Sequence, residues 1–82
     1  MKVLSWNIRG LNSKGKQHYL KDKLKTKKPQ IMLLQETKVS GQKLEAILQS
    51  FKMQYEGMAL DSVGTSGGIA ILWNTTEISA EG

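Results

Sequence analysis

Two polar residues in this sequence, Asn7 and Glu36, each come at the end of a short apolar segment. If those two segments are neighbouring parallel strands, both side chains emerge at the same edge of a sheet, where ligands of α/β proteins bind. A carboxylate beside an amide oxygen suits magnesium, a hard ion that keeps several water ligands and polarises phosphoryl oxygens. The alternative is structural: Asn7 caps a loop and Glu36 is a solvated strand end.

Residues 10–16 match the G-x-x-x-x-G-K pattern of a nucleotide-binding P-loop. That motif requires Ser or Thr after its lysine and an aspartate at the end of the next apolar strand, because both serve the magnesium ion. Gln17 and Gln35 stand at these positions. The sequence therefore argues against a nucleotide-binding loop.

The hydrophobic pattern predicts strands and helices in the order β-α-β-α-β-β. Residues 2–9 alternate between polar and apolar, which is typical of a strand, and the apolar run 31–34 predicts a strand covered on both faces. Residues 53–60 and 68–73 predict two further strands that form an antiparallel hairpin, and a fifth strand is considered from Ile78.

Two segments between these strands predict helices. Residues 16–28 are rich in lysine and carry a narrow apolar stripe of Tyr19, Leu20 and Leu24. The second helix has Ser40 as its N-cap, and its apolar spacing is given by Leu44, Ile47, Leu48 and Phe51. Strands joined by a helix should be parallel through a right-handed crossover, so the fold class is α/β (α+β), a mixed β-sheet with helices on one side.

The 82 residues carry a net charge of +5 that is unevenly distributed. Residues 1–43 hold eleven lysines and arginines against Asp22 and Glu36, a charge of +9, whereas residues 44–82 sum to −4. Such a basic block attracts polyanions, although it is equally typical of a solvated helix. The absence of cysteine excludes disulfides and thiol nucleophiles and favours an intracellular setting. No apolar stretch is long enough for a membrane span.

Three spaced blocks carry a family resemblance. They are residues 5–12 (SWNIRGLN), residues 29–38 (PQIMLLQETK) and residues 67–73 (GGIAILW). In this order they resemble the opening of the endonuclease/exonuclease/phosphatase superfamily, which includes apurinic/apyrimidinic endonucleases and deoxyribonuclease I-like enzymes. The amino-acid sequence of the first block and the tryptophan that ends the third are most similar to endonuclease domains of LINE-type retrotransposons.

The resemblance implies that residues 1–82 are a single partial domain, the N-terminal third of a deoxyribonuclease I-like α/β sandwich. It also implies a phosphodiesterase that nicks DNA with magnesium, manganese being possible. Asn7 and Glu36 match the family's catalytic and metal-binding positions. Arg9 stands where many members have a second polar or acidic residue, so its implied role is phosphate contact, as is that of Lys38.

The 82 residues do not contain the family's later tyrosine, Asp-x-Asn block or Asp-His pair. His18 is expected on the surface and cannot replace that pair, so the resemblance implies that this segment is inactive by itself. DNA is the implied partner and the nucleus the implied location, without a membrane or a small-molecule cofactor. The alternative function is a small basic module that binds nucleic acid without cleaving it, although the sequence shows no aromatic series for base stacking.

Overall fold

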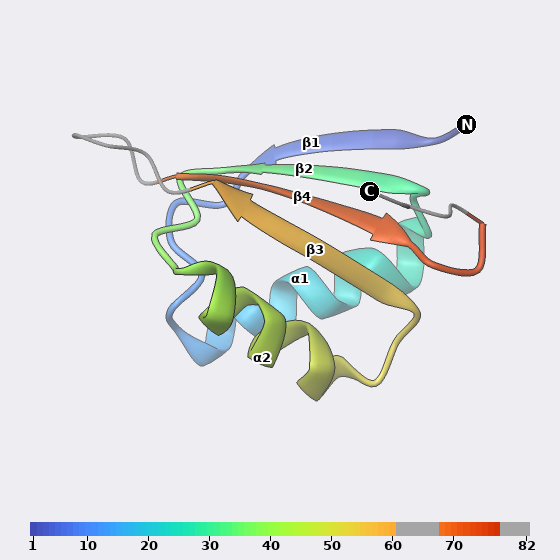
Figure 1. Cartoon of the computed structure of the whole chain (residues 1–82). Coiled ribbons are helices and arrows are strands. Elements are labelled where there is room, and N and C mark those ends of the chain that lie inside the picture. Colours follow the sequence, from blue (N-terminus) through green and yellow to red (C-terminus); the bar gives the residue numbers. More distant parts are fainter. Residues whose placement is uncertain (61–67, 78–82) are drawn as a thin grey trace.

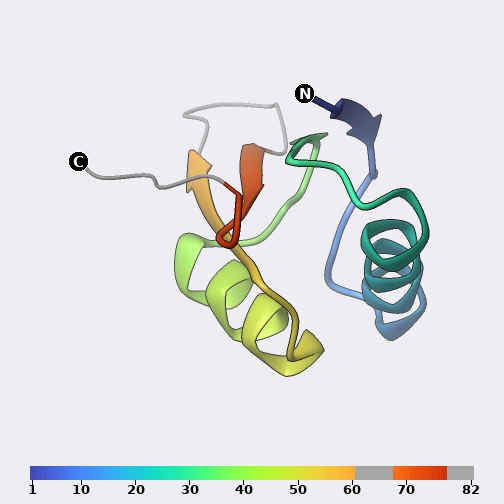
Figure 2. The ribbon, with the colours of Figure 1, turned by 90° about the vertical axis from the view of Figure 1, so that its right-hand side faces the viewer.

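The computed structural model describes residues 1–60 and 68–77, which form a mixed four-stranded sheet and two helices. The elements in chain order are β1 (Val3–Asn7), α1 (Lys14–Lys27), β2 (Ile31–Gln35), α2 (Gly41–Phe51), β3 (Tyr55–Leu60) and β4 (Ile69–Asn74). Both helices lie on the same side of the sheet, α1 towards β1 and α2 towards β3 (Figures 1 and 2). The predicted fold class is confirmed. The fifth strand considered from Ile78 falls outside the described residues.

The strand order is β1-β2-β4-β3. β1 pairs with β2 in parallel, and β4 is antiparallel to both β2 and β3, as the predicted hairpin requires. The register aligns Asn7 with Gln35, Gln35 with Ile69, and Ile69 with Leu60. The ends of β1, β2 and β3 therefore meet the start of β4 at one edge of the sheet.

Helix α1 begins two residues earlier than the apolar pattern predicts, because Ser13 is its N-cap and its hydroxyl accepts a hydrogen bond from the Lys16 amide at 3.2 Å. Only Leu20 and Leu24 of this helix are buried. Tyr19, expected in the same apolar stripe, is 55% exposed. Its ring lies against Trp6 beside the sheet, so the buried edge of α1 is narrower than the sequence indicates.

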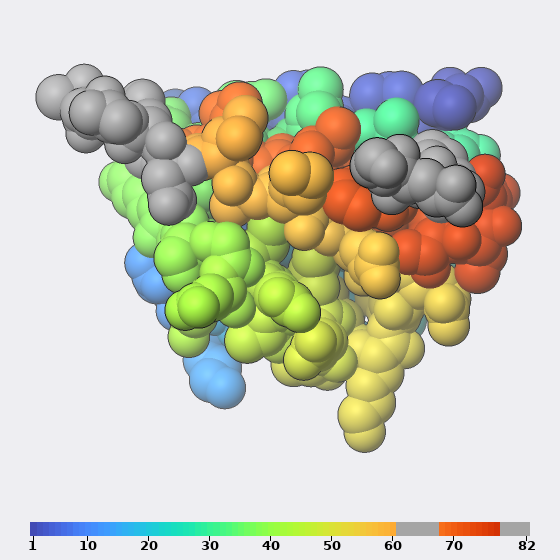
Figure 3. Space-filling model, viewed as in Figure 1, coloured from blue at the N-terminus to red at the C-terminus, as the bar shows by residue number. Residues whose placement is uncertain are grey.

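Helix α2 is amphipathic, as predicted, and has a well-formed N-terminus. The Ser40 hydroxyl accepts a hydrogen bond from the Lys43 amide at 3.1 Å. The buried residues of α2 are Leu44, Ile47, Leu48 and Phe51. Gly57 of β3 lets this helix approach closely, because a Cβ there would lie 3.0 Å from the Leu48 side chain and 2.5 Å from Leu72. Side chains of α2 and β3 form much of the surface seen in Figure 3.

The two faces of the sheet differ in cover. Towards the helices, Leu4, Met32, Leu34, Ala70 and Leu72 contribute to one core. The opposite face carries apolar side chains that are 37–61% exposed: Val3, Leu33, Met58, Leu60, Ile69 and Ile71. Among residues 1–60 and 68–77, the prediction that the strand over residues 31–34 is covered on both faces is therefore wrong, because both helices pack on one side and Leu33 stays exposed on the other. Neither described helix is long and apolar enough to cross a bilayer.

Tyr55 begins β3 and ties it to the end of α1. Its side chain is buried, and its hydroxyl donates a hydrogen bond to the Pro29 carbonyl oxygen at 2.5 Å. Burial raises the pKa of the Tyr55 phenol above its ordinary value and Glu77 adds to the rise, against the opposing effect of a hydrogen bond with Asn74. The folded state thus holds the phenolic proton more strongly than the unfolded chain does.

We predict a loss of stability at alkaline pH that Tyr55→Phe reduces. The raised pKa adds to the free energy of unfolding. This addition is fully present below about pH 10, the ordinary tyrosine pKa, and is lost as pH rises through the folded-state pKa. At neutral pH the variant should be less stable by about 1–2 kcal/mol, because the Pro29 carbonyl loses its partner. Urea unfolding between pH 7 and 11 measures both effects. Parallel pH profiles for the two proteins would contradict the prediction.

Candidate active site

Asn7 and Glu36 meet at the shared edge of β1 and β2. Asn7 ends β1, Glu36 directly follows β2, and the Asn7 Nδ2 atom donates a hydrogen bond to Glu36 Oε2 at 2.5 Å. Asn7 is exposed and Glu36 is half-buried, so both are open to a ligand from solvent. The expectation that these side chains lie on the same sheet edge is confirmed.

Backbone hydrogen bonds continue the pairing of β1 with β2 beyond the strand ends. The Gly10 amide donates to the Glu36 carbonyl oxygen at 2.7 Å, and the Leu11 amide donates to the Thr37 carbonyl oxygen at 2.9 Å. Leu11 and Thr37 are both fully buried. The two loops that carry the candidate residues are therefore bound to each other and anchored in the core.

Three residues of these loops, Arg9, Glu36 and Lys38, adopt left-handed backbone conformations with φ near 55°. Each such conformation costs about 1–2 kcal/mol for a residue other than glycine, and such residues cluster at functional sites. At Glu36 the turn has a direct consequence. Regular alternation would aim its side chain away from the face of Asn7 and Gln35, whereas the observed side chain meets Asn7.

The two cations predicted to contact phosphate, Arg9 and Lys38, belong to the same pair of loops and are both exposed. The Lys38 backbone is held by Asn12, whose Nδ2 atom donates to the Lys38 carbonyl oxygen at 3.0 Å. The Lys38 side chain lies close to Gly10. A Cβ added at Gly10 would be 3.9 Å from the Lys38 Cδ atom. The structure thus places both positive side chains on the loops that carry the Asn7–Glu36 pair.

Thr37 and Gly68 connect this edge to β4. The Thr37 amide donates to the Gly68 carbonyl oxygen at 3.2 Å, and the buried Thr37 hydroxyl has no hydrogen-bond partner among the described residues. Gly68 has a φ of +86°, and a Cβ there would lie 3.2 Å from the Leu60 carbonyl oxygen. A larger residue at position 68 would be strained by its left-handed backbone and crowded against the Leu60 carbonyl oxygen of β3.

Lys16 supports the site, a role that the sequence analysis missed. It is the lysine of the P-loop-like pattern, but Gly15 and Lys16 lie inside α1, and Lys16 Nζ donates to the Ile8 carbonyl oxygen at 2.7 Å. Gln17 similarly donates to the Leu11 carbonyl oxygen at 3.1 Å. Both side chains stabilise the loop after Asn7, which is consistent with the argument against a nucleotide-binding loop. The spacing in sequence contains no signal for these contacts.

The oxygen atoms of Asn7 and Glu36 suit a hard cation that takes only some of its ligands from the protein. Glu36 supplies a carboxylate and Asn7 an amide oxygen, and among residues 1–60 and 68–77 no group of three or more acidic or histidine side chains gathers. Magnesium accepts such a site because it keeps several waters. In the observed geometry the Asn7 nitrogen faces Glu36, so a shared ion requires this amide to turn its oxygen towards the carboxylate.

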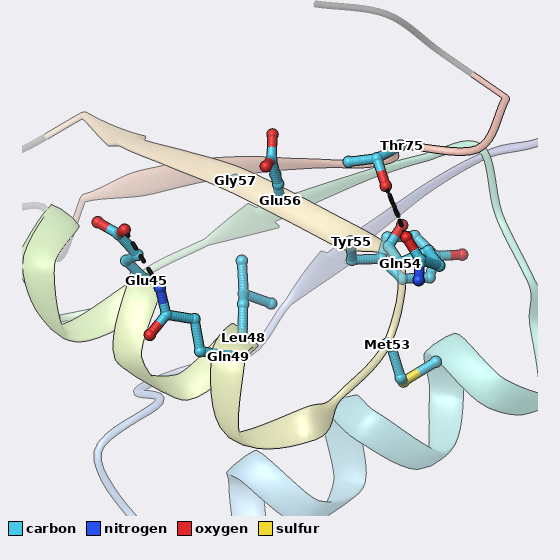
Figure 4. A pocket seen from close by; sticks show the side chains of 9 residues that line it. All are labelled: Glu45, Leu48, Gln49, Met53, Gln54, Tyr55, Glu56, Gly57 and Thr75. Atoms are coloured by element: carbon cyan, nitrogen blue, oxygen red, sulfur yellow. Dashed lines mark hydrogen bonds between the residues drawn. The ribbon is translucent and has the colours of Figure 1, made fainter.

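A hollow of about 500 Å³ lies elsewhere, between α2 and the start of β3 (Figure 4). Tyr55 and Glu56 line it at the end of β3 opposite to Leu60, so it is remote from Asn7 and Glu36. Glu45 and Gln49 turn towards each other there, with the Gln49 amide donating to Glu45 at 3.4 Å. Its side chains do not assemble a catalytic or metal-binding set.

A mixed sheet with helices on one face defines an α/β protein, and in such proteins the strand ends are where ligands commonly bind. Residues 4–80 match the Endonuclease/Exonuclease/phosphatase family, and the chain belongs to this family. A solved structure of the 3′ phosphatase NExo from Neisseria, bound to a product DNA hairpin, is similar, with 28% sequence identity and a TM-score of 0.71. The match covers 90% of this chain and 27% of that chain. A comparison with curated proteins gave no significant match.

The family inferred from the three sequence blocks is thereby confirmed. The retrotransposon branch stays a prediction, as do the catalytic, metal-binding and phosphate-binding roles of Asn7, Arg9, Glu36 and Lys38. His18, expected at the surface, is exposed on α1.

We predict that Glu36→Gln leaves the fold intact. The free energy of unfolding should change by less than about 0.5 kcal/mol, because Glu36 lies outside the core and the new side chain keeps an oxygen for Asn7. Gly68→Ala provides the contrast and should cost about 1–2 kcal/mol through its left-handed backbone. Urea denaturation followed by tryptophan fluorescence measures both values. Unfolding of the Glu36→Gln variant would show that Glu36 is a structural residue.

Proposed function

We propose that this chain is the N-terminal segment of a magnesium-dependent phosphodiesterase that nicks DNA, derived from the retrotransposon branch of its family. The observation that carries the proposal is the contact between Asn7 and Glu36 at the common edge of two parallel strands. The family match supports phosphoester hydrolysis, and the Neisseria neighbour, a 3′ phosphatase bound to product DNA, supports DNA as the substrate class. The intact protein would then act in the nucleus.

Each residue of the edge has a distinct role in this proposal. Glu36 and Asn7 hold a magnesium or manganese ion through side-chain oxygens, and this ion polarises a phosphoryl oxygen when it is bound. Arg9 and Lys38 contact phosphate oxygens from the same pair of loops. Lys16 acts as a positioning residue, since its ammonium group holds the Ile8 carbonyl directly after Asn7.

We predict that Mn²⁺ binds the 82-residue chain at this edge. Paramagnetic broadening in ¹⁵N-¹H spectra should be strongest for the amides of residues 7 and 35–37, and Mg²⁺ should compete with it. Glu36→Gln should abolish the effect, whereas the matched control Glu45→Gln, which removes an exposed carboxylate from α2, should retain it. Broadening that persists in Glu36→Gln would contradict the proposed metal site.

We also predict that the 82-residue chain does not nick supercoiled plasmid in the presence of magnesium. Because Glu36 is assigned to the metal ion, the Asn7–Glu36 pair has no further group to act as general base for water, and catalytic groups that act as a unit lose most of the rate when one is missing. Agarose electrophoresis after prolonged incubation checks this. Nicking by the wild type that disappears in Glu36→Gln would show that the segment is catalytically sufficient.

A further inference from the structure

A group of aromatic and basic side chains lies beside β1, apart from the Asn7–Glu36 pair. The rings of Trp6 and Tyr19 are 5.0 Å apart between centroids and tilted by 35°. Lys23 Nζ lies 5.2 Å from the Trp6 ring centroid and 5.5 Å from that of Tyr19. Together with Lys27, these residues are called here the aromatic–lysine patch.

The patch is open to solvent beside β1, an outer strand of the sheet. β1 is the end strand, and α1 lies beside it (Figure 2). Trp6, Lys23 and Lys27 line a hollow of about 130 Å³. Tyr19 is 55% exposed and is not part of the core that holds α1, which uses Leu20 and Leu24. The Tyr19 ring is therefore available for a contact outside the protein.

The charge of α1 favours an anionic ligand. The helix carries six lysines and a single acidic residue, Asp22, and Lys28 follows as its C-cap. The pair Lys23/Lys27 in the patch is four residues apart, a spacing at which like charges destabilise a helix. Phosphates bound at this pair would relieve that repulsion by neutralising both lysines together.

We propose that the aromatic–lysine patch binds single-stranded nucleic acid, with a base stacked on Tyr19 and phosphates at Lys23 and Lys27. An unpaired strand fits better than a duplex, because only an unstacked base can offer its face to an aromatic ring. Stacking on aromatic rings combined with a basic track is the usual way in which proteins hold single strands without reading their sequence. This site is independent of the proposed hydrolytic function.

The stacking part is tested by fluorescence anisotropy with a labelled thymidine dodecamer and an abasic phosphodiester of equal length at low salt. Tyr19→Leu keeps an apolar side chain and should weaken binding of the dodecamer about fivefold or more, with little effect on the abasic strand. Tyr19→Phe keeps the ring and should bind as the wild type does. Equal affinities of Tyr19→Leu and wild type for the dodecamer would overturn base stacking.

The charge part uses two variants that each remove one lysine. Lys23 lies in the patch, whereas Lys25 lines a different hollow together with Met53 and Tyr55. Lys23→Gln should weaken binding several-fold and lower the slope of log K against log salt by about 0.7, the value for one phosphate contact on a single strand. Lys25→Gln should have a clearly smaller effect. Equal losses in the two variants would show diffuse attraction by the helix and overturn a defined site.

Glu36→Gln separates this proposal from the proposed hydrolytic function. With magnesium present, the variant should leave the affinity for the dodecamer unchanged, because a strand in the patch does not depend on an ion held by Glu36. Failure of metal binding or nicking therefore does not count against the patch. Far-ultraviolet circular dichroism of each variant confirms that the helices are retained. A parallel loss of dodecamer binding in Glu36→Gln would place the strand at the Asn7–Glu36 edge and overturn the separate site.

Discussion

The parallel pairing of β1 with β2 brings together residues that are 29 positions apart in sequence. Its register sets Asn7 opposite Gln35, and backbone bonds from Gly10 to Glu36 and from Leu11 to Thr37 extend the pairing into the loops. Because parallel strands need a long connection, α1 is part of the same arrangement. The aromatic–lysine patch also depends on it, since Trp6 comes from β1 and Tyr19 from the connecting helix.

The site loops combine backbone strain with firm anchoring. Arg9, Glu36 and Lys38 hold left-handed conformations that cost free energy, and the surrounding contacts must offset that cost. Burial of Leu11 and Thr37, together with the bond from Lys16 to the Ile8 carbonyl, provides this support. The strain turns Glu36 towards Asn7, so the loops exchange some stability for the position of a carboxylate.

One face of the sheet is apolar and exposed among the described residues. Leu33, Ile71 and Met58 lie in one register row across three strands and remain more than one third exposed. Such a continuous apolar surface is typical of a sheet that packs against another layer. The chain spans only 27% of the Neisseria structure that it resembles, which is consistent with a sheet that is covered on one side.

Local sequence patterns were sufficient for the element order, the N-cap of α2, the polar and apolar faces of β1, and the family. The meeting of Asn7 and Glu36 was predicted on the condition that their strands are adjacent and parallel, and the structure meets that condition. The sequence did not predict the exposure of Tyr19, the support from Lys16, or the left-handed turn at Glu36. Periodicity reports which side chains share a face of one element. Which partner covers that face, which distant carbonyl a lysine reaches, and the sign of a backbone angle depend on contacts between segments far apart in the chain, and these exist only in the folded structure.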